Sequence, residues 1–459
     1  MAEPLLSIRG LTVALPEGAE RAHAVEGVSI NLEHDEILCV VGESGSGKSV
    51  SANAVMGLLP PQVRPVAGEI VFEGRDLLKL PEADLQKLRG ERIAMIFQEP
   101  MTALNPLMRI GAQIAEVFDA HGALTRRERA AKVVELLRDV GLPEPETIGE
   151  SYPFRLSGGQ RQRVMIGMAL ALEPAILIAD EPTTALDVTT QAQILNLIKE
   201  IQAKRHMGVM FITHDFGVVA EIADRVAVMQ QGELVEIGPA ERVLNRPEHP
   251  YTQRLLAAVP TFAPPPREPV TAPAVLTVEG LDKTYVTGRG LFTRGRRVPA
   301  AQGVSFGIRR GETLGLVGES GSGKSTVGRC IVRLLETDGG HLRVGERDFA
   351  TLEGAELMAE RRHVQMVFQD PYASLNPRRK VGAIIAEGPV AHGTPRREAL
   401  ARARELLDLV GLDARAAERY PHEFSGGQRQ RIGIARALAL EPELLVADEP
   451  VSALDVSVQ

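Results

Sequence analysis

Short runs of mainly apolar residues recur along the chain, and most of them end at an acidic, polar or histidine residue. They lie at 36–41, 175–179 and 208–213, with counterparts at 313–317 and 443–447. Apolar runs without polar alternation are typical of strands that are buried on both faces. Such strands form mainly parallel sheets covered by helices, and ligands bind at the carboxyl ends of the strands. The pattern therefore predicts an α/β fold.

Two longer segments show the helical spacing of apolar residues instead. Residues 99–156 include the amphipathic stretch Arg127–Val140, and residues 370–424 are the matching segment later in the chain. An apolar stripe at this spacing buries one face of a helix. We therefore expect a helical subdomain inserted in each α/β core.

One octapeptide, Gly-Glu-Ser-Gly-Ser-Gly-Lys-Ser, occurs at Gly42–Ser49 and again at Gly318–Ser325. The other motifs described below repeat in the same order, which predicts two homologous domains. Residues 262–274 carry five prolines and are the predicted linker. The predicted domains are residues 1–261 and residues 275–459.

Both octapeptides fit the phosphate-binding pattern G-x-x-x-x-G-K-[ST]. Their glycines let backbone N–H groups approach phosphate at a helix N-terminus. Lys48 would reach the β- and γ-phosphates, and the Ser49 hydroxyl would bind Mg²⁺. The predicted nucleotide-binding residues of the two loops are Gly42, Glu43, Ser44, Gly45, Ser46, Gly47, Lys48, Ser49, Gly318, Glu319, Ser320, Gly321, Ser322, Gly323, Lys324, Ser325 and Thr326.

Acidic pairs follow two of the apolar runs. Asp180 and Asp448 are predicted to face Mg²⁺ from a neighbouring strand end. The next residues, Glu181 and Glu449, are placed to polarise a water molecule for attack on the γ-phosphate. His214 follows another apolar run, from which it would reach the γ-phosphate or that water.

Ser-Gly-Gly-Gln precedes a helical run in each copy. This tetrapeptide suits either a plain helix N-cap or a second anion site, because both use a serine and bare backbone N–H groups at a helix start. The residues are Ser157, Gly158, Gly159, Gln160, Ser425, Gly426, Gly427 and Gln428.

Composition limits the kinds of partner that the chain is expected to bind. The net charge of −8 argues against nucleic acid as the default partner. The longest apolar stretch, Val164–Ala179, is interrupted by Glu173 and Pro174, so any membrane role is expected to be peripheral. The two cysteines, Cys39 and Cys330, are predicted to be reduced and packed in cores.

In this order, the motifs resemble those of the ATP-binding cassette (ABC) ATPases over nearly the whole chain. The resemblance implies that Gln98 and Gln369 contact Mg²⁺ and sense a transmembrane partner, and that Asp187 and Asp455 are the D-loop aspartates. It makes Tyr285 the residue that stacks on adenine, where the first domain has Leu15. It also implies that two cassettes close head to tail with ATP and Mg²⁺ between them. The implied metal ligands are Ser49, Gln98, Asp180, Ser325, Gln369 and Asp448.

Narrower motifs are similar to those of the peptide/opine/nickel importer ATPases. They are Leu104-Asn105-Pro106, Leu375-Asn376-Pro377 and His249-Pro250-Tyr251-Thr252. This resemblance implies an ATPase on the cytoplasmic face of the inner membrane. Its partners would be two transmembrane permease subunits and, indirectly, an extracytoplasmic solute-binding protein. The sequence does not select the solute.

The second copy departs from the family pattern, because Gln459 is reached before a counterpart of His214. We therefore expect a second domain that is truncated, with cassettes pairing within the chain, or between two chains if that domain is incomplete. Two alternatives stay open from the sequence. One is a soluble tandem ABC ATPase that acts on ribosomes or DNA, and the other is a nucleotide-binding scaffold without turnover.

Overall fold

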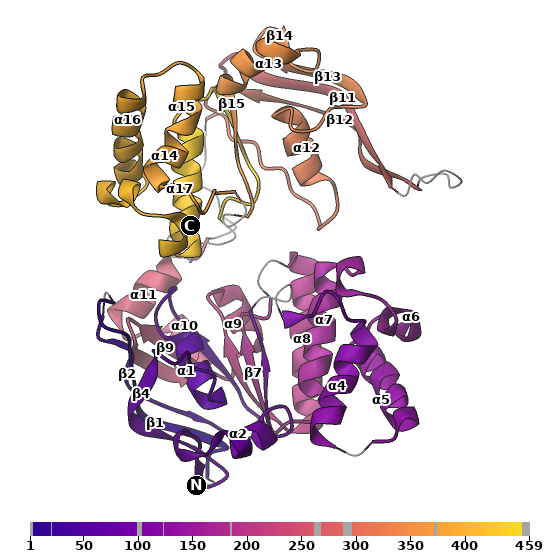
Figure 1. Ribbon diagram of the computed structural model, residues 1–459, viewed down its shortest axis with the longest axis vertical. Helices are drawn as coiled ribbons and strands as arrows, with labels where there is room; N and C mark the ends of the chain where they lie inside the picture. The colour runs from indigo at the N-terminus through magenta and orange to yellow at the C-terminus, as the bar shows by residue number, and fades with distance from the viewer. Residues whose placement is uncertain are drawn as a thin grey trace. The chain divides into compact units, whose positions relative to one another are not determined.

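The computed structural model describes residues 3–19, 21–98, 103–122, 124–183, 186–260, 268–287, 296–370 and 374–451. The chain divides into two compact units between Thr261 and Phe262 (Figure 1).

The core of the first unit is a sheet in the order β10-β9-β3-β8-β7-β6. Neighbouring strands are parallel except for β10, which is antiparallel to β9. Every residue of β3, β7 and β8 is buried, as expected for a sheet covered on both faces. The strands are β3 (Ile37–Val41), β6 (Ile93–Ile96), β7 (Ile176–Asp180), β8 (Gly208–Ile212), β9 (Arg225–Gln230) and β10 (Glu233–Pro239). The predicted parallel α/β core is confirmed.

A second, antiparallel sheet in the order β2-β1-β4-β5 packs over this core and was not predicted. Its strands are β1 (Leu6–Ala14), β2 (His23–Leu32), β4 (Arg64–Phe72) and β5 (Arg75–Asp76). Buried residues of β1, β2 and β4 share one hydrophobic cluster with Leu38, Met210 and helix α1 (Lys48–Met56). Helix α1 is thus held in the core between the two sheets.

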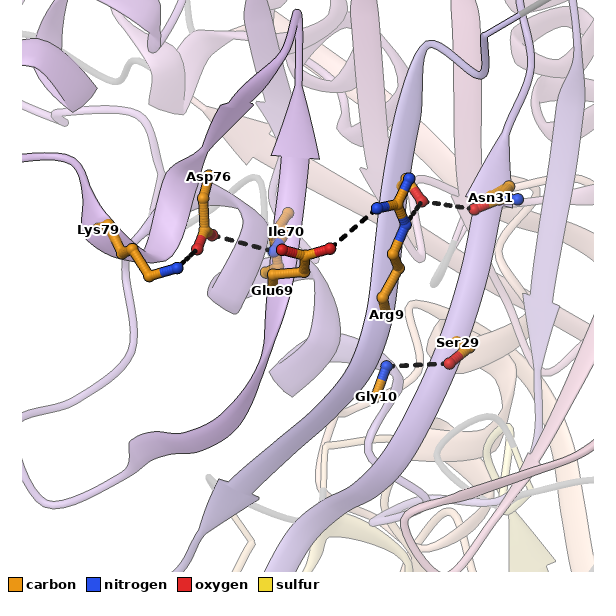
Figure 2. Close-up of polar contacts among 9 residues, drawn as sticks. Arg9, Gly10, Ser29, Asn31, Glu69, Ile70, Asp76 and Lys79 are labelled. Atoms are coloured by element: carbon orange, nitrogen blue, oxygen red, sulfur yellow. Dashed lines mark hydrogen bonds and ion pairs between the residues drawn. The ribbon is translucent and has the colours of Figure 1, made fainter.

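Side chains also join the strands of this antiparallel sheet on its polar face. Figure 2 shows Arg9 of β1 reaching Glu69 of β4, with 2.9 Å between Nη1 and Oε1. On the other side of β1, the Ser7 hydroxyl donates to Asn31 of β2 at 2.8 Å. These contacts fix the register of β1 between its neighbours.

Helices cover the other face of the parallel sheet and extend from it. The group α4–α7 lies together on one side of the unit (Figure 1). Helix α5 begins with a capping box, in which Thr125 and Glu128 bond each other's backbone N–H groups. The remaining helices are α2 (Glu82–Leu88), α4 (Ile110–His121), α5 (Arg126–Asp139), α6 (Pro145–Gly149), α7 (Gly158–Leu170), α8 (Val188–Arg205), α9 (Phe216–Ile222), α10 (Ala240–Asn245) and α11 (Pro250–Ala257), with 3₁₀ turns at Leu77–Lys79 and Pro153–Arg155.

The second unit repeats parts of this plan. An antiparallel sheet in the order β12-β11-β13-β14 is accompanied by the parallel pair β15 and β16. The strands are β11 (Ala274–Thr287), β12 (Arg296–Arg309), β13 (Gly339–Val344), β14 (Arg347–Asp348), β15 (Val364–Val367) and β16 (Leu444–Ala447). The helices are α12 (Lys324–Ile331), α13 (Gly354–Glu360), α14 (Val381–Ile385), α15 (Glu387–Ala391), α16 (Arg396–Leu409) and α17 (Gly426–Leu438), with 3₁₀ turns at Arg361–His363, Ala414–Glu418 and Pro421–Glu423.

The expected strand at residues 313–317 is wrong, because this segment has no ladder partner and Val317 is 90% exposed. Its counterpart in the first unit, β3, is hydrogen-bonded to β8 on one side and β9 on the other. The described part of the second unit ends at Val451. It contains no strand that corresponds to β8 or to β9. An apolar run becomes a strand only when neighbouring strands satisfy its backbone groups.

None of the helices in the described ranges combines the length and the apolar character that a membrane span requires.

Candidate functional site

The loop 42–49 leaves the carboxyl end of β3 and enters α1 at Lys48. Its path requires two glycines. Gly42 has a φ of 150°, and a Cβ there would lie 2.1 Å from the Met229 carbonyl oxygen. Gly47 has a φ of 100°, and its Cβ would lie 2.7 Å from the Ala24 carbonyl oxygen. The loop therefore packs directly on backbone, which fixes its curvature.

Lys48 turns back into this loop. Its ammonium group donates to the carbonyl oxygens of Gly42 at 2.7 Å and Glu43 at 3.0 Å. The residue is 6% exposed, so its positive charge lies inside the concave loop. A buried ammonium group beside a helix N-terminus makes this loop attractive to anions.

Ser49, in the first turn of α1, pairs with Asp180, the last residue of β7. The Ser49 hydroxyl donates to Asp180 Oδ1 at 3.0 Å. Burial raises the pKa of Asp180 to about 6, and the nearby Glu181 adds to the rise while the Ser49 hydrogen bond opposes it. A hydroxyl oxygen and a carboxylate oxygen side by side suit Mg²⁺, which takes the rest of its shell from water and phosphate oxygens. These two residues therefore fit the metal that the sequence predicts.

Glu181 links two further predicted residues. Its Oε2 accepts a hydrogen bond from Gln98 Nε2 at 2.9 Å, and its Oε1 lies 3.2 Å from His214 Nδ1. The backbone of Glu181 is left-handed, with a φ of 47°, an unusual conformation for a residue other than glycine. This strained turn places the carboxylate between Gln98, two residues beyond β6, and His214, two residues beyond β8.

The second unit builds the same arrangement from its own residues. Lys324 Nζ donates to Gly318 O at 2.7 Å, and the Ser325 hydroxyl donates to Asp448 Oδ1 at 2.9 Å. Gln369 Nε2 donates to Glu449 Oε2 at 2.6 Å, and Glu449 is also left-handed with a φ of 46°. The second loop is more exposed than the first. In the first unit, β9 supplies Met229 against the loop, whereas the described part of the second unit has no such strand.

Ser157 and Ser425 are the N-caps of α7 and α17. The Ser157 hydroxyl accepts from Gln160 N at 3.2 Å, and Gln160 Oε1 accepts from Ser157 N at 3.0 Å. Ser425 and Gln428 form the same capping box, with distances of 3.3 and 3.0 Å. Both Ser-Gly-Gly-Gln motifs therefore form a helix cap. Gly158, Gly159, Gly426 and Gly427 occupy the first turns, where their N–H groups face outward from the helix start.

The other predicted site residues come from other elements, and one of them, Tyr285, touches the residue that follows the second loop. Asp187 caps α8 by accepting from Thr190 N at 2.9 Å, and this bond lowers the pKa of its carboxyl group. Tyr285 lies on β11 with its hydroxyl 3.4 Å from Thr326 Oγ1. Leu15 follows β1, where its N–H group donates to Ala22 O. Asp455 lies outside the described residues.

Sequence reasoning missed two residues that contact the first loop. Arg21 Nη2 donates to Gly45 O at 2.6 Å, while its Nη1 is buried and has no hydrogen-bond partner among the described residues. The Tyr251 hydroxyl accepts from Glu43 N at 3.1 Å. No motif marks Arg21, and the motif around Tyr251 was used only as a sign of one family branch.

Comparison with known proteins decides the family. The family model "ABC transporter" matches residues 25–184 and 301–452, which together exceed half of the chain. The chain belongs to the ABC transporter family. A second model, "Oligopeptide/dipeptide transporter, C-terminal region", matches residues 235–280 of this ABC transporter chain. The expected fold class, the ATPase activity coupled to transport and the peptide-importer branch are thereby confirmed.

Two curated relatives cover nearly all of this ABC transporter chain. The glutathione import ATP-binding protein GsiA of Escherichia coli O157:H7 is 49% identical over 488 residues, which cover 99% of this chain and 78% of the relative. The peptidoglycan transport ATP-binding protein YejF of Agrobacterium fabrum is 49% identical over 462 residues, which cover 100% and 84%. A solved dimer of MJ0796, a bacterial ABC transporter cassette, covers 51% of this chain and 98% of its own, at 31% identity and a TM-score of 0.47.

Proposed function

We propose that the chain is the energy-coupling ATPase of an importer for peptides or related small solutes such as glutathione. It would act with two transmembrane permease subunits on the cytoplasmic face of the inner membrane, and an extracytoplasmic protein would deliver the solute. The observation that carries this proposal is the match of residues 235–280 to the oligopeptide/dipeptide transporter region. The relatives named for glutathione import and peptidoglycan transport support it.

In the first unit, loop N–H groups and Lys48 would hold the β- and γ-phosphates of ATP. Ser49 and Asp180, with Gln98, would hold Mg²⁺, which neutralises charge on the phosphate oxygens when bound. Glu181 would polarise the attacking water from its position between Gln98 and His214. The contact between His214 Nδ1 and Glu181 Oε1 supports this division of roles, because the imidazole holds the carboxylate in one orientation.

In the second unit, the corresponding roles fall to Lys324, Ser325, Asp448 and Glu449, with Gln369. Each nucleotide-binding site would be completed by the helix that begins at the Ser-Gly-Gly-Gln motif of another cassette. Ser425 would close on the first site and Ser157 on the second, within one chain or between two chains. The capped first turns of α7 and α17 support this proposal, because they present rigid N–H groups to an anion.

The substitution Glu181→Gln tests the assignment of the first site. It keeps the size of the side chain but removes the charge that polarises water, so ATP binding is retained while turnover at this site falls by about a hundredfold or more. Phosphate release is measured in a Lys324→Ala background, which isolates the first site. The matched control is Glu200→Gln, an exposed residue of α8, which leaves turnover unchanged. Equal turnover in both variants would contradict the proposed role.

Purification of the tagged chain from membranes tests the transport proposal. Two permease subunits are expected to co-purify, and the reconstituted complex is expected to take up a labelled dipeptide or glutathione only with ATP. Isolation with ribosomes or DNA, without any permease, would instead favour the alternative of a soluble tandem ATPase.

A further inference from the structure

A tyrosine from the C-terminal segment of the first unit touches the nucleotide loop. Tyr251, on α11, lies 208 positions after Glu43 and accepts a hydrogen bond from the Glu43 N–H group at 3.1 Å. Its side chain is 4% exposed and belongs to the main hydrophobic cluster of the unit. The hydroxyl therefore meets the loop from inside the core, where a lost hydrogen bond is not readily replaced by water.

Neighbouring residues hold Tyr251 in place. His249 caps α11, because its Nδ1 accepts from the Tyr251 N–H group at 3.2 Å, and Pro250 occupies the first turn. Just before α11, the backbone is held by β10, because the Glu236 carboxylate accepts from Glu248 N at 3.0 Å and from His249 N at 3.1 Å. Burial opposes ionisation of Glu236, but these hydrogen bonds outweigh it and leave its pKa below the ordinary value. The motif His249-Pro250-Tyr251 thus has a local structural purpose.

The same loop residue is held from its other side. Lys48 Nζ donates to the Glu43 carbonyl oxygen at 3.0 Å, while Tyr251 accepts from the Glu43 N–H group. Both polar backbone groups of Glu43 are therefore fixed at the point where β3 passes into the loop. A loop that is already in its binding conformation loses less conformational entropy when phosphate arrives.

We propose that Tyr251 is a positioning residue for the first nucleotide site, through which helix α11 braces the phosphate loop. The inference rests on the proposed binding of ATP by loop 42–49. The inference gives Tyr251, a residue of the region that matches the oligopeptide/dipeptide transporter model, a role at the nucleotide site. The hydrogen bond between the Tyr251 hydroxyl and Glu43 N would transmit a displacement of α11 to the loop.

The test is Tyr251→Phe in the full chain with Lys324→Ala, so that one nucleotide site is measured. Phenylalanine fills the same apolar space and deletes only the hydroxyl. A buried neutral hydrogen bond corresponds to about a fivefold change in an equilibrium constant. We expect the Kd for the fluorescent analogue TNP-ATP with Mg²⁺, and the KM for ATP, to rise about fivefold, with kcat within about twofold of the parent.

Two further variants make the result decisive. Tyr152→Phe removes a tyrosine hydroxyl from the same unit, where the ring stacks on Phe154 and the hydroxyl bonds Arg109, and it is expected to leave the Kd unchanged. A Tyr251→Phe protein with unaltered Kd, or one that melts earlier without any change in Kd, would overturn the inference. Lys48→Ala in the same background tests the site itself. If that variant still binds TNP-ATP as tightly as the parent, the proposed function of the loop fails, rather than the brace alone.

Discussion

At the scale of single residues, the first loop depends on side chains that come from distant parts of the chain. Arg21 and Tyr251 approach it from opposite ends of the first unit's sequence, and each bonds a backbone group of the loop. The glycines give the loop its curvature, but they do not hold it in place. The fixed conformation comes from these partners and from Lys48.

Replacement of Arg21 by alanine is expected to weaken ATP binding at the first site about three- to tenfold. The variant loses a charge-assisted hydrogen bond to the Gly45 carbonyl oxygen and a positive charge near the phosphates. The measurement is the Kd for TNP-ATP with Lys324→Ala as background. Arg127→Ala, an exposed residue of α5, serves as the control. A Kd equal to that of the control would show that Arg21 is dispensable.

The sequence identified the residues around Asp180 and Glu181, but it did not identify Arg21 and Tyr251 as residues that support the loop. Ser49, Asp180 and Glu181 stand in motifs whose spacing has a chemical reason, and the structure brings them together with Gln98 and His214. Arg21 lies in a short turn without a motif. Its contact with Gly45 depends on how β1 and β2 fold over α1, which no local pattern encodes.

At the scale of elements, helix starts were predicted best because their signals are local. Both α1 and α12 begin at the lysine of the octapeptide, as the motif implies. The strand at 313–317 was predicted from the same kind of apolar run as β3, yet it is not formed. Strand formation depends on neighbours far away in sequence, and only the segment at β3 has them.

The helix cap and the proposed anion site at Ser157 are separable by substitution. Ser157→Asp keeps an N-cap acceptor, so the melting temperature is expected to stay close to that of the parent. Its negative charge would oppose the γ-phosphate of the site that it completes, and turnover there is expected to fall about tenfold or more. Ser157→Ala instead loses the cap, which costs about 1 kcal/mol and lowers the melting temperature by about 2–4 °C.

Phosphate release and thermal melting are measured for both variants in a Lys48→Ala background, which leaves the second site active. Undiminished turnover of Ser157→Asp would mean that this serine is only a helix cap.

At the scale of the whole molecule, the repeated loops predict two bound nucleotides for each chain. Both units pair their lysine, serine and acidic residues in the same way. Lys48→Ala and Lys324→Ala are each expected to reduce the stoichiometry from two nucleotides to one, and the double variant is expected to bind none. Isothermal titration with a slowly hydrolysed ATP analogue measures this. Lys204→Ala, an exposed lysine of α8, should still bind two. A stoichiometry of one nucleotide per parent chain would contradict the prediction of two nucleotide sites.

The left-handed backbone at Glu181 and Glu449 affects which substitutions evolution would retain at these positions. A residue other than glycine in this conformation costs about 1 kcal/mol or more, whereas asparagine adopts it readily. An exchange of Glu181 for asparagine would therefore relax the turn and also remove a negative charge beside buried Asp180. The most active form of this turn is thus less stable than its inactive variants. Selection for stability alone would erode hydrolysis, and only continued demand for turnover would keep a glutamate at this position.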